Sequence, residues 1–455
     1  MTHLNTKSGE FWRFLIRIAV PIALQQLLIN SLSFIDTLFI SQLGDISLSA
    51  SGMAFQYNWL LNMITFGFCS GATLFVSQFW GAKKYDDITK TYKVSTICTL
   101  VISVVFTLLA LFIPEKIMSV FNSNPLVIKE GAIYLKYVCY AYIPTALTSI
   151  MGSILRSCEN VKLPMAVSVI SISLNIFLDY AMIFGKFGFD KMGIMGGAIA
   201  TAISAWVGFV ALIFISYLHK NVLVVSLKDF LKVKFLDFKI FMKRAFPVVF
   251  NELTWGLGTV VTNAIYSNTG YQNFAACTIL RTVESMCLIL FIGLNDGGAV
   301  LIGKTIGEKD HNRAYSYAKK LAITVPLISL LVGSVAVIFR HSIVGIFNMS
   351  SNISSVSVDL ASVLIIIYGL ELCLRNIPYT MVCAIFRSGG DTVTPVKYDL
   401  TCLWVLAIPT TFVLANFTNL AFPIIFLCHY LVEDIPKVFM CIRHFVSKRW
   451  IKPVV

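Results

Sequence analysis

The residues of this chain best able to do chemistry are polar side chains placed inside long apolar segments. Asp36 and Asp179 each lie about six residues before the end of such a segment, and Asn175 lies one helical turn before Asp179. Thr201 lies about eight residues into the next apolar segment. At about 1.5 Å per helical residue, both carboxyl groups are expected at one depth, roughly 9 Å below the same membrane face. A charge at the bilayer centre costs at least about 2.5 kcal/mol, so these residues are functional candidates.

These four side chains offer the chemistry of a small cation site. Oxygen ligands suit hard cations, and a carboxyl group in a low-dielectric cavity holds a proton readily. The cluster therefore predicts a site for H⁺ or for Na⁺ at Asp36, Asn175, Asp179 and Thr201. The structural alternative is hydrogen bonding between helices, which contributes about 0.6 kcal/mol per pair.

The elements that position this cluster are expected to be transmembrane helices. Of the 455 residues, 57% are hydrophobic and 13% are charged, against roughly 25% charged in soluble domains. Apolar runs of about 20 residues are typical of membrane spans. They predict an all-α membrane protein with twelve spans, near residues 17–41, 51–79, 94–113, 131–154, 164–185, 193–218, 245–267, 274–302, 321–339, 359–385, 396–415 and 420–442.

The net charge of +13 is distributed as an orientation signal. Lys and Arg concentrate in alternate connecting segments, at residues 7–17, 83–93, 220–244, 304–320 and 443–452. The opposite connections hold few basic residues. The positive-inside rule then predicts a multi-pass protein of the cell (inner) membrane with both termini cytoplasmic. No nucleic-acid partner is expected, because the basic residues follow this alternation.

The second half of the chain repeats residues of the first half at a constant offset. Pro21 recurs as Pro247, and three glycines of the first half recur at the same offset, Gly67 as Gly293, Gly71 as Gly297 and Gly81 as Gly307. Such repeats are typical of transporters whose two lobes move about a central site. We expect two pseudo-symmetric six-helix lobes, residues 1–220 and 245–455, joined by a cytoplasmic linker at 221–244.

Four motifs carry a resemblance to a known family. Residues 33–44 (SFIDTLFISQLG) resemble the first-helix motif of the multidrug and toxic compound extrusion (MATE) family, within the MOP flippase superfamily. Residues 175–185 (NIFLDYAMIFG) and 196–201 (GGAIAT) are similar to its fifth and sixth helices, and residues 387–392 (RSGGDT) to the turn after its tenth helix. The first-half counterpart of this turn, residues 156–160 (RSCEN), departs from the motif. The resemblance implies H⁺- or Na⁺-coupled export of cationic, amphipathic drugs, with the cation site at the four positions named above.

The second half does not repeat the acidic residues of the first. It holds a different candidate acidic site, at Glu252, Glu284, Asp296 and Glu371. Helical spacing allows Arg281 to neutralise Glu284, and Arg375 to neutralise Glu371, so for these two acids a structural role and a functional one stay open. Glu252 and Asp296 have no basic neighbour in helical register, which favours a functional role.

The sequence therefore predicts a secondary active multidrug antiporter. The alternative is a flippase for a lipid-linked precursor, which shares the two-lobe fold but would favour a basic cavity. Trp255, beside Glu252, is a candidate for the substrate cavity, with helix packing as its alternative role. An enzyme is not expected, because no catalytic constellation is present. We expect no cofactor beyond the coupling ion, small organic cations and the lipid bilayer as partners, and a monomer.

Overall fold

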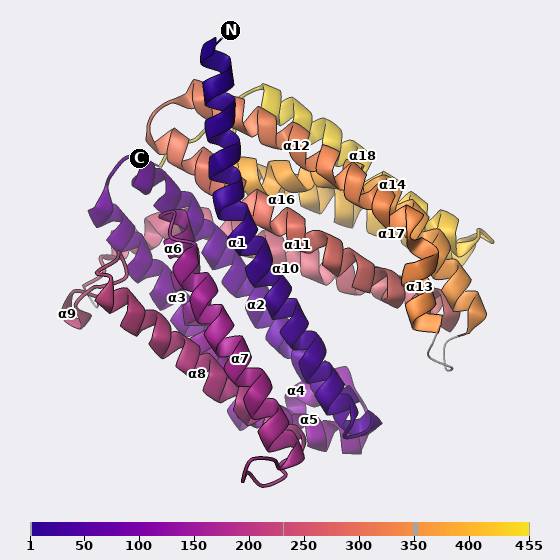
Figure 1. The fold of residues 1–455 in the computed structure, drawn as a ribbon. Coiled ribbons are helices and arrows are strands. Elements are labelled where there is room, and N and C mark those ends of the chain that lie inside the picture. Colours follow the sequence, from indigo (N-terminus) through magenta and orange to yellow (C-terminus); the bar gives the residue numbers. More distant parts are fainter. Residues whose placement is uncertain (1, 231, 349–353, 455) are drawn as a thin grey trace. The chain divides into compact units, whose positions relative to one another are not determined.

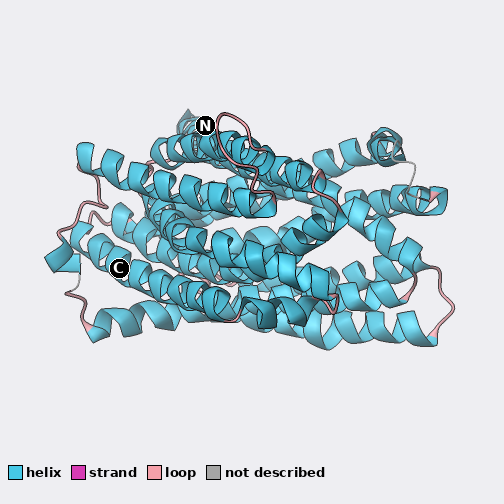
Figure 2. Cartoon of the chain, turned by 90° about the horizontal axis from the view of Figure 1, so that it is seen from below, coloured by secondary structure: helices cyan, strands magenta, loops and turns pink. Residues whose placement is uncertain are grey.

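The protein is built almost entirely of helices. The computed structural model describes residues 2–230, 232–348 and 354–454. Within those ranges the chain forms long helices joined by short loops (Figure 1, Figure 2). Ten helical segments are long and apolar enough to cross a membrane. The long helices are α1 (Thr2–Ser41), α2 (Asp45–Gly81), α3 (Tyr85–Phe112), α5 (Pro125–Val138), α6 (Tyr142–Ser157), α7 (Lys162–Phe184), α8 (Ile194–Leu218), α10 (Phe235–Asn268), α11 (Tyr271–Gly307), α12 (His311–Ile338), α14 (Ser355–Thr380) and α18 (Phe422–Val446).

Several spans are composed of consecutive helical pieces. The fourth span joins α5, the 3₁₀ turn η1 (Cys139–Ala141) and α6. The tenth joins α14, the π-helix η2 (Met381–Phe386) and α15 (Arg387–Gly389), and the eleventh joins α16 (Val393–Asp399), the π-helix η3 (Leu400–Ala407) and α17 (Ile408–Phe417). The short helices α4 (Pro114–Phe121), α9 (Leu227–Phe230) and α13 (Arg340–Asn348) lie in connections.

The helix count agrees with the twelve expected spans. The seventh and twelfth spans are the helices α10 and α18, with 34 and 25 residues. Both carry buried charged residues, Glu252 in α10 and Glu433 and Asp434 in α18. These two helices are not among the ten candidate spans of the described residues.

Contacts divide the chain into two compact units, each containing a piece of the other half. The first unit is Leu24–Val249, and the second is Met1–Ala23 with Phe250–Val455. The start of α1 therefore belongs with the second half, and the start of α10 belongs with the first. The chain passes from one unit to the other after Ala23 and again after Val249. Each of these positions lies two residues after a repeated proline, Pro21 or Pro247, so the two positions are related by the offset of the sequence repeat. The expected lobe boundaries at 220 and 245 concern the sequence repeat and stay a prediction.

The repeated glycines make these exchanged contacts possible. A Cβ atom on Gly67 would lie 2.6 Å from Val249 Cα, in the first unit. At the equivalent place in the second unit, a Cβ on Gly293 would lie 2.7 Å from the carbonyl oxygen of Ala19. Small residues let membrane helices approach closely. The duplication therefore preserves two equivalent helix crossings.

Gly67→Ala should consequently destabilise the protein by about 1–3 kcal/mol, because the added methyl group meets backbone atoms that cannot move cheaply. Gly52→Ala, in the same helix, is the matched control, since its Cβ would have nothing within 4 Å. Thermal unfolding in detergent measures both. Equal melting temperatures for the two variants would contradict the close crossing.

The turns of the two halves close with the same hydrogen bonds. In the first half, Glu159 N donates to Arg156 O at 3.0 Å and Asn160 N to Leu155 O at 2.9 Å. The same bonds recur in the second half with the same two lengths, from Gly390 N to Arg387 O and from Asp391 N to Phe386 O. The departure of residues 156–160 from the motif therefore leaves the turn geometry unchanged, with Glu159 at φ +65°.

Candidate functional site

The four residues expected to form the first-half site come from three helices of the first unit. Asp36 lies on α1, Asn175 and Asp179 lie on α7, and Thr201 lies on α8. Asn175 and Asp179 are buried, each with about 1% of its surface exposed. Asp36 and Thr201 are half-buried.

Two glycines bring α8 against α7 at this point. A Cβ on Gly196 would lie 2.8 Å from the backbone carbon and oxygen of Met182. A Cβ on Gly197 would lie 3.7 Å from Asp179 Oδ1. The GGAIAT motif thus has a physical role, because it lets α8 lie directly over the acidic residue.

The side chains of Asp36 and Asp179 lie close together and line the same pocket. A hydrogen bond between two carboxyl groups requires a proton on one of them, since ionised carboxylates only accept. The Oδ1 atom of each residue accepts no hydrogen bond from the described part of the chain. The pair could therefore share one proton, and it keeps oxygen lone pairs for another ligand.

Asn175 and Thr201 form hydrogen bonds that stabilise the helices α7 and α8 beside the two carboxyl groups. With its amide oriented to satisfy both partners, Asn175 donates to Asp179 Oδ2 at 3.3 Å and accepts from Thr201 N at 3.2 Å. The Thr201 hydroxyl donates to Gly197 O at 2.9 Å. Both polar groups thus have partners inside the helix pair.

A small pocket of about 180 Å³ opens over the site. Its walls come from α1, α5, α7 and α8, and they are lined by Asp36, Ile40, Tyr134, Asp179, Ile183, Gly197 and Thr201. The pocket suits a proton, an ion or water. Sequence reasoning missed Tyr134, because one tyrosine in an apolar run gives no signal of its own.

The donor set consists of two carboxylates, an amide and a hydroxyl, whose oxygens can bind a proton or a hard cation. Hard cations are held by several oxygen ligands at once. The oxygens without a hydrogen-bonding partner at this site are, among the described residues, Oδ1 of Asp36 and Oδ1 of Asp179. Across the described residues, no group of three or more His, Cys, Asp or Glu side chains could hold a metal.

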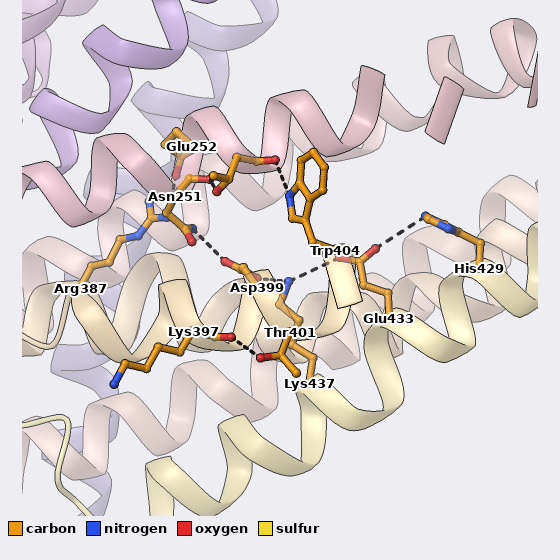
Figure 3. A network of polar contacts seen from close by, with 11 residues as sticks. Asn251, Glu252, Arg387, Lys397, Asp399, Thr401, Trp404, His429, Glu433 and Lys437 are labelled. Carbon is orange, nitrogen blue, oxygen red and sulfur yellow. Dashed lines mark hydrogen bonds and ion pairs between the residues drawn. The ribbon is translucent and has the colours of Figure 1, made fainter. Parts of the chain in front are cut away.

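In the second unit, Glu252 forms a buried ion pair with a residue outside its own helix. Arg387 Nη2 lies 2.6 Å from Glu252 Oε1, and about 5% and 12% of the two side chains are exposed (Figure 3). Arg387 stands at the start of α15, far along the chain. Helical register within α10 therefore does not reveal the basic partner of Glu252, because this partner comes from another helix.

A second charged group continues from this pair along α18 (Figure 3). Asn251 donates to Asp399 Oδ2 at 2.8 Å, and Lys437 forms an ion pair with the same carboxylate. Lys437 Nζ also lies 3.6 Å from Glu433 Oε1, and His429 Nε2 lies 3.8 Å from Glu433 Oε2. Lys437 therefore offsets part of the negative charge of Asp399 and Glu433.

The remaining acids of the second-half set have mixed surroundings. Glu284 pairs with Arg375 of α14 at 3.4 Å, whereas the Arg281 side chain binds Asn263. Glu371 lies against Asp434, and no N–H group of the described residues donates to either of its oxygens.

Asp296 and Glu252 both act electrostatically on the Tyr379 phenol, which places them in one region of the unit. Trp255 packs in a small apolar cluster with Leu403 and Ile408. A role of Trp255 in a substrate cavity stays a prediction.

Comparison with known proteins identifies the architecture. The family model MatE matches residues 21–181 and 247–413, two segments that begin at the two repeated prolines. A probable multidrug resistance protein NorM of Thermotoga maritima is 24% identical over 412 residues, covering 90% of this chain and 87% of that protein. The uncharacterized transporter YisQ of Bacillus subtilis is 23% identical over 437 residues, covering 95% and 93%.

Solved structures share the fold. The crystal structure of a mutant of the Vibrio cholerae MATE transporter VcmN superposes with a TM-score of 0.88 at 17% identity, covering 98% of this chain and 99% of that one. The match of one family model to both halves, together with this fold, shows that the chain belongs to the MATE family of multidrug efflux transporters.

Proposed function

We propose that this protein is a proton-coupled antiporter that exports cationic, amphipathic compounds across the cell membrane. The observation that supports the proposal is the close pair of Asp36 and Asp179 in one small pocket, because two neighbouring carboxyl groups can share a proton. The basic residues in alternate connections support an inner-membrane location with both termini cytoplasmic.

In the proposed cycle, the carboxyl pair exchanges its proton as the transporter alternates between its two open states. Protonation allows Asp36 and Asp179 to approach each other, which draws α1 toward α7. Loss of the proton leaves two carboxylates that repel, so α1 is pushed away. Proton binding thereby favours one arrangement of α1 over the other, and such a difference in affinity is the condition for coupling.

Na⁺ is the competing coupling ion, and the second-half acids are the competing site. The oxygens of Asn175 and Thr201 keep lone pairs beside the hydrogen bonds that they form, so the gradient experiment below must distinguish Na⁺ from H⁺. Glu252 and Glu284 are each paired with an arginine, so Glu371 is the second-half acid that we propose as a further proton site.

The test uses purified protein in sealed vesicles, with a fluorescent organic cation as substrate and one imposed gradient at a time. We expect a pH gradient to drive accumulation without Na⁺, and a Na⁺ gradient at equal pH to drive none. Vesicles with neither gradient give the passive rate. Accumulation driven by Na⁺ alone would refute proton coupling, and no accumulation under either gradient would refute antiport of this substrate class.

A further inference from the structure

The residues that follow α18 return to the turn after the tenth span. Beyond the end of α18 at Val446, Lys452 N donates to Gly389 O at 2.7 Å, and Gly390 and Ile451 form an antiparallel bridge. The Trp450 side chain is fully buried and stacks on Phe445, with ring centroids 6.0 Å apart. A C-terminal segment held by backbone bonds and a buried tryptophan is part of the folded unit.

Two glycines of the turn make room for this contact. A Cβ on Gly389 would clash with the Trp450 ring, and a Cβ on Gly390 would clash with Lys452 O. The first-half turn forms the same hydrogen bonds with Cys158 and Glu159 at these positions. The hydrogen bonds of the turn therefore do not require Gly389, whose lack of a side chain makes room for the C-terminal segment, whereas Gly390 also adopts a left-handed φ of +98°.

Asp391 anchors the segment from inside the turn. Only 1% of its surface is exposed, and its Oδ2 atom lies 2.8 Å from Lys452 Nζ and 2.9 Å from His444 Nε2. The Thr394 hydroxyl donates to the same oxygen at 2.8 Å. These partners outweigh burial and hold the pKa of Asp391 well below its usual range. The anchor is therefore present above about pH 4 and is lost only as the pH falls through the lowered value.

The same turn begins with the residue that neutralises Glu252. Arg387 is the first residue of α15, two residues before Gly389, and the Phe386 ring packs near Trp450 with centroids 6.5 Å apart. We propose that residues 447–454, here called the C-terminal latch, dock on residues 386–391 and thereby position Arg387 against Glu252. Trp450 and Asp391 are then positioning residues that act through Arg387. The proposal does not depend on proton coupling at Asp36 and Asp179.

Docking is tested by hydrogen exchange on the full-length protein in lipid nanodiscs. Gly389→Ala should raise the exchange rate of the amides in residues 450–452 by at least about tenfold, because the methyl group occupies the place of the indole. Gly52→Ala serves as the control and should leave these rates unchanged. In a variant that ends at Ser447, Gly389→Ala should have no further effect on exchange in residues 386–391. Unchanged rates in full-length Gly389→Ala, or an equal effect with and without the segment, would overturn the latch.

Positioning is tested by a double-mutant comparison of transport at matched protein amounts. Trp450→Ala should lower the transport rate about fivefold, and Trp450→Phe should restore most of it. In a background of Glu252→Gln with Arg387→Met, Trp450→Ala should lower the rate by less than twofold, because the pair that it positions is gone. An equal loss in both backgrounds would show that Trp450 does not act through Arg387 and would overturn that part of the proposal.

Discussion

Asp179→Asn is expected to lower pH-driven efflux by at least about tenfold, to near the passive rate. The amide keeps the shape of the side chain and can still hydrogen-bond to Asp36, but it cannot take up or release a proton. Asp36→Asn removes the other half of the shared-proton pair and should have the same effect. Efflux of a fluorescent cation from cells or vesicles under an imposed pH gradient measures both variants.

Two controls separate coupling from general damage. Asp45→Asn makes the same chemical change at an exposed position on α2 and should leave efflux unchanged. Thr89→Val removes a hydroxyl that donates to Tyr85 O within its own helix, outside the site, so its efflux should stay within about twofold of the unmodified protein. Normal pH-driven efflux in either Asp36→Asn or Asp179→Asn would show that the pair does not couple transport.

Arg387→Met is expected to cause the largest loss of stability, about 3–5 kcal/mol. The substitution leaves the Glu252 carboxylate buried without its cation, and an uncompensated buried charge is far more costly than the loss of a pair. Adding Glu252→Gln to Arg387→Met should recover most of the loss, because a neutral pair of similar volume is often as stable as a buried ion pair. Melting temperatures of the two variants in detergent measure the difference.

Lys397→Met is the matched control, since it removes a positive charge from an exposed side chain of the neighbouring helix α16. Its melting temperature should not change. If the variant with both substitutions melts no higher than Arg387→Met alone, Arg387 stabilises the fold by some means other than neutralising Glu252.

Features that follow from local periodicity could be predicted from the sequence. Apolar runs indicated the spans, and the constant offset between repeated prolines and glycines indicated the duplication. The depth of Asp36 and Asp179 could be counted along their helices, because both helices were expected to end at the same membrane face. These inferences use only the regular rise of an α-helix and the alignment of the chain with itself.

Partners from distant helices could not be predicted in the same way. Glu252 has no basic neighbour in helical register, and its partner Arg387 comes from a helix 135 residues further on. Helical spacing permits Arg375 to neutralise Glu371, but the ion pair of Arg375 is with Glu284 on another helix. Helical spacing identifies neighbours only on one face of one helix, whereas a buried charge in a helical bundle is often neutralised by a residue of another helix. The contribution of Tyr134 to the pocket could not be predicted either, because Tyr134 comes from a different helix, α5.

The exchange of first helices between the two units also bears on synthesis and ancestry. The start of α1 is made well before its packing partners in α11, which lie in the second half of the chain. The first unit likewise stays incomplete until residues 235–249 are made. In a six-helix ancestor with this arrangement, the first segment of each copy would have packed against a second copy, as in a domain-swapped dimer. Gene fusion would then have turned an exchange between two polypeptides into one within a single chain.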